Sequence, residues 1–496
     1  MLGLIYGLVV LTSIMQIPFL LTPGLAWQNY LLVTLLFGIA VYFLNQLKDQ
    51  KNQNHLPIRL HHWCVLAVTV FIPSYVAYLH IHDYSIWLDE YAETRNILKF
   101  DILSAATFYQ QPPLGYYWRK WGYLLLGQNE LGARSASLIA NSLFLTTMFF
   151  NFKKITKDLV TSCIATLILG FNYWIITYAI EARSYQISLF YFSVYIYFLI
   201  EYFQNTNESK HARGGIKLGI ITTLWLLSIS MQPLFFVSLV TVFIGGYYFK
   251  SRTRKLKVLL FSQLGALLMF LPFLKKIIDN SQRYVTTSDV NSKSISSLWW
   301  DLRYLARDLF FQNTYDAIML VIVGLALALS FKFSKNRKRI AIIFIFLLSY
   351  FFIIQIVFFI KINWHFSARY LITIIPAFGL AVIYALTELP PKFKFFRYAV
   401  ITLGLALTIL NFISGEHIKR YAEDWRGLYE KLNEDAPLGT PGFFIHLHQP
   451  NSWSGEYFVA YEFYQQNQLS IPKMDDYDFP VKITNDFLLA AFNGPQ

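Results

Sequence analysis

The sequence predicts an all-α protein that crosses a membrane many times. Its mean hydropathy is +0.42, and charged residues make up 14% of the chain, whereas soluble domains carry about 25%. Apolar runs of about 20 residues recur along the chain up to residue 414, and each is long enough for a helix to cross the hydrocarbon of a bilayer. These observations exclude an ordinary soluble domain.

About 13 of these runs are expected to be membrane-spanning helices. The first begins at Leu2 with no basic segment before it and no small-residue cleavage site, so we interpret it as a retained span. The two cysteines, Cys64 and Cys163, lie inside apolar runs, which argues against a disulfide framework or a metal motif. The expected spans are 2–21, 28–46, 62–81, 131–151, 158–179, 184–204, 216–232, 233–249, 257–274, 316–332, 339–360, 367–387 and 396–414.

The distribution of basic residues predicts the orientation. A net charge of +13 would suggest a nucleic-acid partner in a soluble chain. Here the basic residues gather in short loops that all fall on one side of the predicted membrane, and the positive-inside rule makes that side cytoplasmic. We therefore expect a multi-pass protein of the plasma (inner) membrane with a cytoplasmic N-terminus, an external C-terminus, contacts to membrane lipids and no nucleic acid. The loops carry Lys153/Lys154/Lys157, Lys210/Arg213/Lys217, the basic residues of 250–257, Lys335/Arg337/Lys338/Arg339 and Lys392/Lys394/Arg397.

Three parts of the chain are expected. Residues 1–61 hold two opening spans and a cytoplasmic loop, residues 62–414 form the transmembrane domain, and residues 415–496 are polar enough for a small external α/β domain. Within the transmembrane domain, the segments 82–130 and 275–315 are expected to face outward, because they are too polar to lie in lipid.

The stretch Leu114–Leu126 inside the first outward segment is short, aromatic and charged, as helices that lie in the membrane interface are. A crossing is the alternative, but it would move the basic cluster at 250–257 to the outside. Arg119 and Lys120 are expected to be interfacial anchors. An aromatic belt, with one ring stacking on a sugar in a less favoured interpretation, would consist of Trp118, Trp121, Trp299 and Trp300.

Two adjacent carboxylates, Asp89 and Glu90, follow the predicted span 62–81 and lie where hydrocarbon gives way to water. A carboxylate that is partly desolvated there becomes more basic, which suits proton abstraction. The alternative is that both acids cap the end of a membrane helix and stay solvated.

Several residue strings occur in a set order along the predicted topology. They are Asp89-Glu90, Gln111-Pro112-Pro113-Leu114-Gly115-Tyr116-Tyr117, Gly127-Gln128-Asn129-Glu130 with Arg134, Glu181-Ala182-Arg183-Ser184-Tyr185, His365-Phe366-Ser367-Ala368-Arg369-Tyr370-Leu371 and Glu423-Asp424-Trp425-Arg426-Gly427. In this order they resemble the family 39 glycosyltransferases, in the bacterial branch related to protein O-mannosyltransferases and to the aminoarabinose transferases of lipid A. The resemblance covers about residues 62–430.

The resemblance implies the C-type glycosyltransferase membrane fold (GT-C) and a sugar donor carried on a polyprenyl phosphate at the outer face of the membrane. Charged nucleotide sugars do not cross bilayers, so an outward active site needs such a carrier. The acceptor would be a protein, a glycolipid or a wall polysaccharide. The chain departs from the family at Gln111, where a His or Lys is usual, at Met231-Gln232, where a His is usual, and in its two opening spans.

The family pattern also implies roles. Asp89 would be the base that takes the proton of the acceptor hydroxyl in an inverting transfer, and Glu90 would orient the acceptor or a metal. The departing phosphate is a stable anion, so cations rather than a strong acid would stabilise it. Arg303 and Arg307, spaced to share one helix face, would bind that phosphate together with Arg369 and Gln111.

Each of these assignments has an alternative. Arg303 and Arg307 would suit anionic headgroups on an interfacial helix, and Arg369 could snorkel. Glu181 and Arg183 would either form a mutual ion pair at the end of a span or, with Tyr117, bind the acceptor or a divalent metal ion. His365 has no His or Cys partner at metal spacing, which indicates a structural imidazole.

Two rival functions remain open from the sequence. A transporter or flippase should place ionisable residues and broken helices near mid-bilayer, whereas Asp89, Glu90, Glu181, Arg183 and Arg369 gather at one membrane face. A non-catalytic GT-C relative is the other alternative, because Gln111 and Met231-Gln232 depart from the family pattern.

Overall fold

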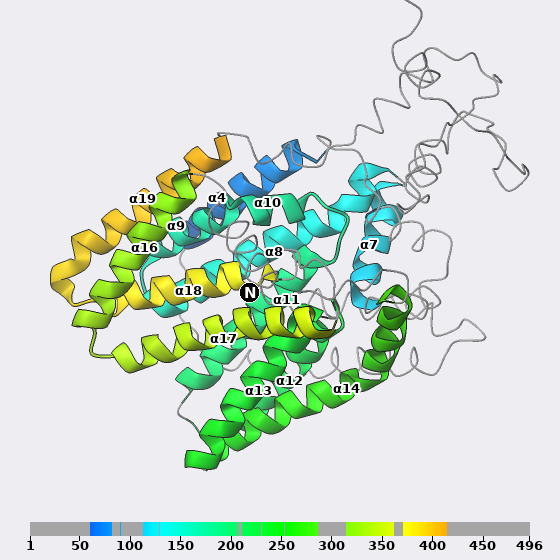
Figure 1. Cartoon of the computed structure of the whole chain (residues 1–496). Helices are drawn as coiled ribbons and strands as arrows, with labels where there is room; N and C mark the ends of the chain where they lie inside the picture. The colour runs from blue at the N-terminus through cyan, green and yellow to red at the C-terminus, as the bar shows by residue number, and fades with distance from the viewer. Residues whose placement is uncertain are drawn as a thin grey trace, which may run out of the picture. The chain divides into compact units, whose positions relative to one another are not determined.

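The computed structural model describes residues 60–81, 90, 113–127, 129–205, 207, 211–229, 231–251, 253–285, 314–361 and 371–413. All regular structure in these ranges is helical, and no strand occurs in them (Figure 1). The helices are α4 (Leu60–Leu79), α7 (Pro113–Leu126), α8 (Glu130–Thr156), α9 (Leu159–Gly170), α10 (Tyr173–Ala179), α11 (Tyr185–Gln204), α12 (His211–Leu226), α13 (Met231–Ser251), α14 (Arg254–Val285), α16 (Thr314–Phe333), α17 (Arg337–Lys361), α18 (Ile374–Thr387), the 3-10 turn η3 (Pro391–Phe393) and α19 (Lys394–Ile413). The prediction of an all-α polytopic membrane protein is confirmed.

The chain divides into two compact units. The first comprises residues 1–81 and 96–419, and it contains all the helices named above. The second comprises residues 82–95 and 420–496, and Glu90 is its one described residue. The predicted spans 2–21 and 28–46, and the predicted external α/β domain of 415–496, lie outside the described residues.

Every predicted span from 62–81 onward coincides at least in part with a described helix. Four of these helices are long and apolar enough to cross a membrane on their own, and shorter apolar helices occupy the third, tenth and twelfth predicted spans. The four spans are Glu130–Thr156, Tyr185–Gln204, Pro233–Ser251 and Pro391–Ile413. Residues 275–285, which belong to the second predicted outward segment, continue α14.

The predicted span 158–179 is wrong as a single helix. It consists of α9 and α10, which are bent by 65° at a short break. Asn172 adopts an extended backbone there, and its side-chain oxygen accepts a hydrogen bond from the N–H of Trp174 at 3.1 Å. That bond caps the start of a new helix, which explains why the chain turns while the sequence stays apolar.

A two-residue connection makes α8 and α9 antiparallel neighbours. Lys157 ends α8 in the left-handed conformation, with φ of 56°, and Asp158 caps α9 by accepting the N–H of Thr161 at 2.9 Å. Burial alone would raise the pKa of Asp158, but hydrogen bonds from Thr161 and Tyr398 outweigh it and lower the pKa below its ordinary value. The carboxylate therefore stabilises this end of the bundle in its charged form.

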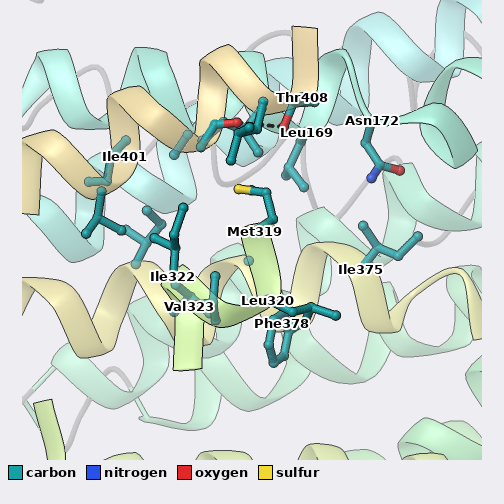
Figure 2. A pocket seen from close by; sticks show the side chains of 18 of the residues that line it. Leu169, Asn172, Met319, Leu320, Ile322, Val323, Ile375, Phe378, Ile401 and Thr408 are labelled. Atoms are coloured by element: carbon teal, nitrogen blue, oxygen red, sulfur yellow. Dashed lines mark hydrogen bonds between the residues drawn. The ribbon is translucent and has the colours of Figure 1, made fainter. Parts of the chain in front are cut away.

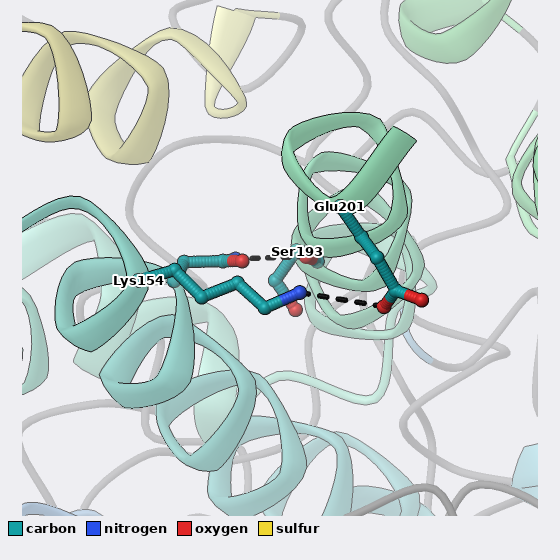
Figure 3. A network of polar contacts seen from close by, with 4 residues as sticks. Lys154, Ser193 and Glu201 are labelled. Atoms are coloured by element: carbon teal, nitrogen blue, oxygen red, sulfur yellow. Dashed lines mark hydrogen bonds and ion pairs between the residues drawn. The ribbon is translucent and has the colours of Figure 1, made fainter. Parts of the chain in front are cut away.

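Hydrogen bonds along the interface of α8 and α11 hold the centre of the bundle together. The amide of Asn151 donates to the carbonyl of Ser193 at 2.9 Å, and Lys154 pairs with Glu201 at 3.3 Å (Figure 3). Nearer the other end, the amide of Gln186 donates to Asn141 at 2.8 Å. Hydrocarbon offers polar groups no partners, so each such bond is worth about 0.6–2 kcal/mol between membrane helices. Aromatic rings of Phe192, Tyr195, Trp225, Phe236 and Tyr350 fill the neighbouring core.

Candidate active site

Described residues from several strings of the family resemblance lie on elements that meet at one end of the bundle of the first unit. The N–H of Leu114, at the start of α7, donates to the carbonyl of Leu227 just after α12, at 3.0 Å. Arg134, near the start of α8, donates to the carbonyl of Ile81 just after α4, at 2.6 Å. The first bond ties the start of α7 to the end of α12, and the second ties the start of α8 to the end of α4. The loop 180–184 between α10 and α11 is hydrogen-bonded to both α7 and α8.

Arg119 fixes that loop to α7. Its guanidinium donates to the carbonyl of Ala182 at 2.8 Å through Nη1 and to the carbonyl of Gly115 at 3.3 Å through Nε. The ring of Tyr116 lies 5.0 Å from its charge, and the side chain is 0% exposed. The prediction of an interfacial anchor is therefore wrong for Arg119, because a buried guanidinium that bonds two carbonyls positions backbone instead of touching headgroups.

Glycines bring α7 close enough for that contact. A Cβ placed on Gly115 would lie 2.0 Å from the hydroxyl of Ser184, and one placed on Gly122 would lie 2.3 Å from the carbonyl of Gly132 on α8. Gly115, Arg119 and Gly122 recur at helical spacing and share one face of α7. The packed face of α7 is thus the one that carries two glycines and the arginine.

Glu181 and Arg183 lie two residues apart in the loop that Arg119 holds. One carboxylate oxygen of Glu181 is buried. Arg183 is 8% exposed, its guanidinium donates to the hydroxyl of Tyr185 at 3.4 Å, and its carbonyl accepts the hydroxyl of Ser137 at 3.1 Å. The loop therefore presents one carboxylate and one guanidinium from a backbone that α7 and α8 both fix.

Tyr185 lies beside the guanidinium of Arg183, whose charge is 5.4 Å from its ring. The ring of Tyr185 packs against that of Tyr178 in a tilted arrangement with centroids 4.9 Å apart, and Tyr117 on α7 is 2% exposed within the hydrophobic core. Trp118, expected in an interfacial belt, is partly buried against Phe190 of α11, with ring centroids 5.9 Å apart. Trp118 therefore packs against a neighbouring helix of the bundle.

Several predicted site residues lie outside the described parts of the chain: Asp89, Gln111, Arg303, Arg307, His365 and Arg369. Glu90 is described, is 0% exposed, and belongs to the second unit. Of the predicted set, the structure describes Tyr117 on α7 and Glu181 and Arg183 in the loop 180–184. Within the described ranges, no three His, Cys, Asp or Glu side chains gather as metal ligands would.

Sequence reasoning gave no functional weight to Arg119. The signal that could have found it is the spacing of Gly115 and Gly122 on either side, since glycines seven residues apart mark the closely packed face of a membrane helix. Lys120, by contrast, is partly exposed.

An apolar cavity of about 180 Å³ lies elsewhere, between α9, α16, α18 and α19 (Figure 2). Asn172, Thr408 and Asn411 are its polar lining residues besides Tyr173, and the hydroxyl of Thr408 donates to the carbonyl of Gly404 at 2.9 Å. Its described lining has no carboxylate and no cationic side chain. The cavity thus suits hydrocarbon and does not contain the predicted catalytic chemistry.

Comparisons with known proteins bear on the fold. The sequence matches no protein-family profile and no curated protein. The crystal structure of ArnT from Cupriavidus metallidurans bound to undecaprenyl phosphate is similar, with a TM-score of 0.55 and 14% sequence identity over 84% of this chain and 87% of that one. The apo structure of the same protein matches with a TM-score of 0.48 and 17% identity, over 68% of this chain and 62% of that one. The chain accordingly has the GT-C membrane fold that ArnT represents.

Proposed function

We propose that this protein is a membrane glycosyltransferase that moves a sugar from a polyprenyl-phosphate donor to an acceptor outside the plasma (inner) membrane. The observation that carries the proposal is the shared fold with a structure that holds undecaprenyl phosphate, over most of both chains. The residue strings of the family resemblance support it, because two of them meet where Arg119 of α7 contacts the loop 180–184.

In the proposed reaction the acceptor hydroxyl attacks the anomeric carbon of the sugar, and the bond from that carbon to the phosphate oxygen breaks. Asp89 takes the hydroxyl proton, and the configuration at the anomeric carbon inverts. The polyprenyl phosphate leaves as an anion, which Arg303, Arg307 and Arg369 stabilise with Gln111.

Glu90, Tyr117, Glu181 and Arg183 orient the acceptor in this proposal. The buried guanidinium of Arg183 can donate hydrogen bonds, and the partly buried carboxylate of Glu181 can accept them. Both would bind hydroxyl groups of the sugar or of the acceptor molecule. Glu181 would be one ligand of a divalent ion, which would complete its shell with further oxygen atoms.

A transporter is the second candidate, because the 65° break between α9 and α10 is the kind of interrupted helix that transporters use. Transporter sites gather ionisable groups at such a break. Here the cavity beside the break is lined by apolar side chains, amides and hydroxyls, and no described carboxylate or cationic side chain lines it, which favours transfer chemistry at the end of the bundle.

The proposal is tested with the purified protein in proteoliposomes that contain radiolabelled polyprenyl-phosphate sugars. Asp89→Asn is expected to lower transfer by about 10²-fold or more, the contribution of a general base. Glu93→Gln, a nearby carboxylate without an assigned role, is the matched control and should keep its activity. Full activity in Asp89→Asn would reject Asp89 as the base.

A further inference from the structure

The apolar cavity between α9, α16, α18 and α19 has one polar end. α9 and α19 run side by side in the same direction. Tyr398, near the start of α19, donates to Asp158 at the start of α9 at 3.3 Å, and the rings of Phe171 and Phe412 at the other ends of these helices lie 5.9 Å apart. Ile401 lines the cavity toward the first end (Figure 2). The amides and hydroxyls of the lining belong to the second end and are those of Asn172, Tyr173, Thr408 and Asn411.

This polar end lies within the hydrocarbon layer and not among the headgroups. From Asp158 to Asn172 the chain rises about 21 Å, and the 14 residues of α18 span about the same distance. The hydrocarbon core of a bilayer is about 30 Å thick. The cavity is therefore at the depth of lipid chains. The headgroup of a lipid whose chain filled it would lie beyond the polar end, in the leaflet that the positive-inside rule makes the outer one.

Helix α10 leads from the polar end of the cavity to the loop of the candidate active site. Its seven residues rise about 10 Å. The rings of Tyr173 and Trp174 lie 5.2 Å apart, and Trp174 stacks on Tyr178 at 5.7 Å. Tyr178 in turn contacts Tyr185 at 4.9 Å, and the charge of Arg183 is 5.4 Å from that last ring. A lipid with its chain in the cavity would thus have its head beside α10, about 10 Å or less from the loop.

The lining indicates which kind of lipid would fit. An apolar cavity of about 150 Å³ stays dry and binds benzene, so the 180 Å³ found here accommodates a short length of hydrocarbon chain. Amides and hydroxyls both donate and accept hydrogen bonds, which suits the hydroxyl groups of an uncharged head. A phosphate would require cations, and no described residue of the lining carries one.

On the basis of the proposed function, we propose that the cavity binds a hydrocarbon chain of the acceptor, and that the acceptor is a glycolipid with an uncharged head. The head lies along α10 and presents a hydroxyl group to Glu181 and Arg183. Three classes of acceptor remained open: a protein, a glycolipid and a wall polysaccharide. The glycolipid is the one that brings a hydrocarbon chain and an uncharged head to this place.

Photolabelling of the full-length protein in proteoliposomes tests this proposal. The probes are a monohexosyl diacylglycerol, phosphatidylglycerol and polyprenyl phosphate, each with a diazirine on its chain. The glycolipid should label peptides that line the cavity in preference to the other two probes, and an excess of unlabelled glycolipid should suppress the label.

Two substitutions fill the cavity from different helices. A Cβ on Gly404 would lie 3.4 Å from Ile168, and one on Gly379 would lie 3.6 Å from Leu169, so larger side chains at both positions enter the lined space. Gly404→Leu and Gly379→Leu should each lower the labelling about tenfold, the loss expected when roughly two methylene groups are displaced. Gly324→Leu on α16 is the matched control, because a Cβ there meets no atom within 4 Å and Gly324 does not line the cavity. Melting temperatures show which filling variant folds as the wild type does, and that variant decides the test.

Several results would overturn the proposal. Equal labelling of the lining by the glycolipid and by phosphatidylglycerol would mean that the cavity takes any lipid chain. Preferential labelling by polyprenyl phosphate would assign the cavity to the donor, and undiminished labelling in a folded filling variant would place the glycolipid elsewhere. Sugar transfer to free hexose as efficient as transfer to the glycolipid would exclude a role for the chain. Labelling does not depend on turnover, so a wild type that labels as expected but transfers no sugar would contradict the proposed function alone.

Discussion

The guanidinium of Arg119 on α7 donates a hydrogen bond to the carbonyl of Ala182, 63 residues later in the chain, at 2.8 Å. Ala182 lies between Glu181 and Arg183, the two charged residues of the loop from α10 to α11. One buried side chain therefore sets the backbone on which both charges stand.

Replacing Arg119 by Met should destabilise the protein and disturb this loop. The carbonyls of Ala182 and Gly115 would lose their donor in a buried place, at a cost of about 1–3 kcal/mol each. The melting temperature in detergent should fall, and transfer activity should fall with it. Lys120→Met, which removes a partly exposed charge from the same helix, is the control and should change neither value appreciably. Equal stability of the two variants would show that Arg119 does not hold the loop 180–184 in place.

The contact of Gly115 with Ser184 predicts a double-mutant cycle. Gly115→Ala should cost about 1–3 kcal/mol, because its Cβ would lie 2.0 Å from the hydroxyl of Ser184. Ser184→Gly removes the two nearest clashing atoms, so the double variant should recover much of the lost stability, measured by thermal unfolding. Gly265→Ala in α14 meets no atom within 4 Å and should be neutral or slightly stabilising. Additive effects of the two substitutions would mean that the helices do not approach as described.

Asp158 predicts a dependence of stability on pH. Its pKa is lowered in the folded protein, so its contribution is fully present above the ordinary pKa of about 4 and is lost as the pH falls through the folded value. Asp158→Ala should cost about 1 kcal/mol at pH 7 through the lost cap of α9. The difference in melting temperature between wild type and variant should shrink below about pH 4. A difference that stays constant from neutral to strongly acidic pH would exclude a charged cap.

The placement of Glu181 beside Arg183 predicts that a substitution at Glu181 changes the use of the acceptor. It should lower stability less than Arg119→Met does. Glu181→Gln keeps the shape of the side chain and removes its charge, so the protein should still fold. If the acceptor contacts this loop, KM for the acceptor should rise and KM for the lipid donor should not. Unchanged kinetics for both substrates would confine Glu181 to a structural role.

The sequence predicted the helices of the bundle because each apolar run is long enough to be a span and basic loops separate the runs. It missed the break at Asn172, since α9 and α10 are apolar on both sides of it and the cap depends on one side-chain hydrogen bond. The charge of Arg119 also led to the expectation that this residue lies at the membrane interface. Its burial depends on a carbonyl far along the chain, and the spacing of Gly115 and Gly122 marks the packed face of the helix but not that partner.

Motif order marked Tyr117, Glu181 and Arg183. The structure describes Tyr117 on α7 and holds the loop of Glu181 and Arg183 against α7 and α8, while the roles of these residues stay predictions. The positions of Gly115 and Ser184 within the same motifs become meaningful only through their close approach. Residue types in the sequence suggested the transfer chemistry. The packing distances in the structure identified the residues that hold the loop 180–184 in position.

Transfer and transport differ most directly in the fate of the labelled sugar. Proteoliposomes would carry a polyprenyl-phosphate sugar labelled at the anomeric carbon, with an acceptor extract outside and, in a parallel sample, a labelled nucleotide sugar in its place. The account predicts that the label leaves the lipid, that free polyprenyl phosphate appears in equal amount, that the acceptor carries the sugar with inverted configuration, and that the nucleotide sugar gives no product. Label that crosses the bilayer still attached to its lipid, with no polyprenyl phosphate released, would contradict it.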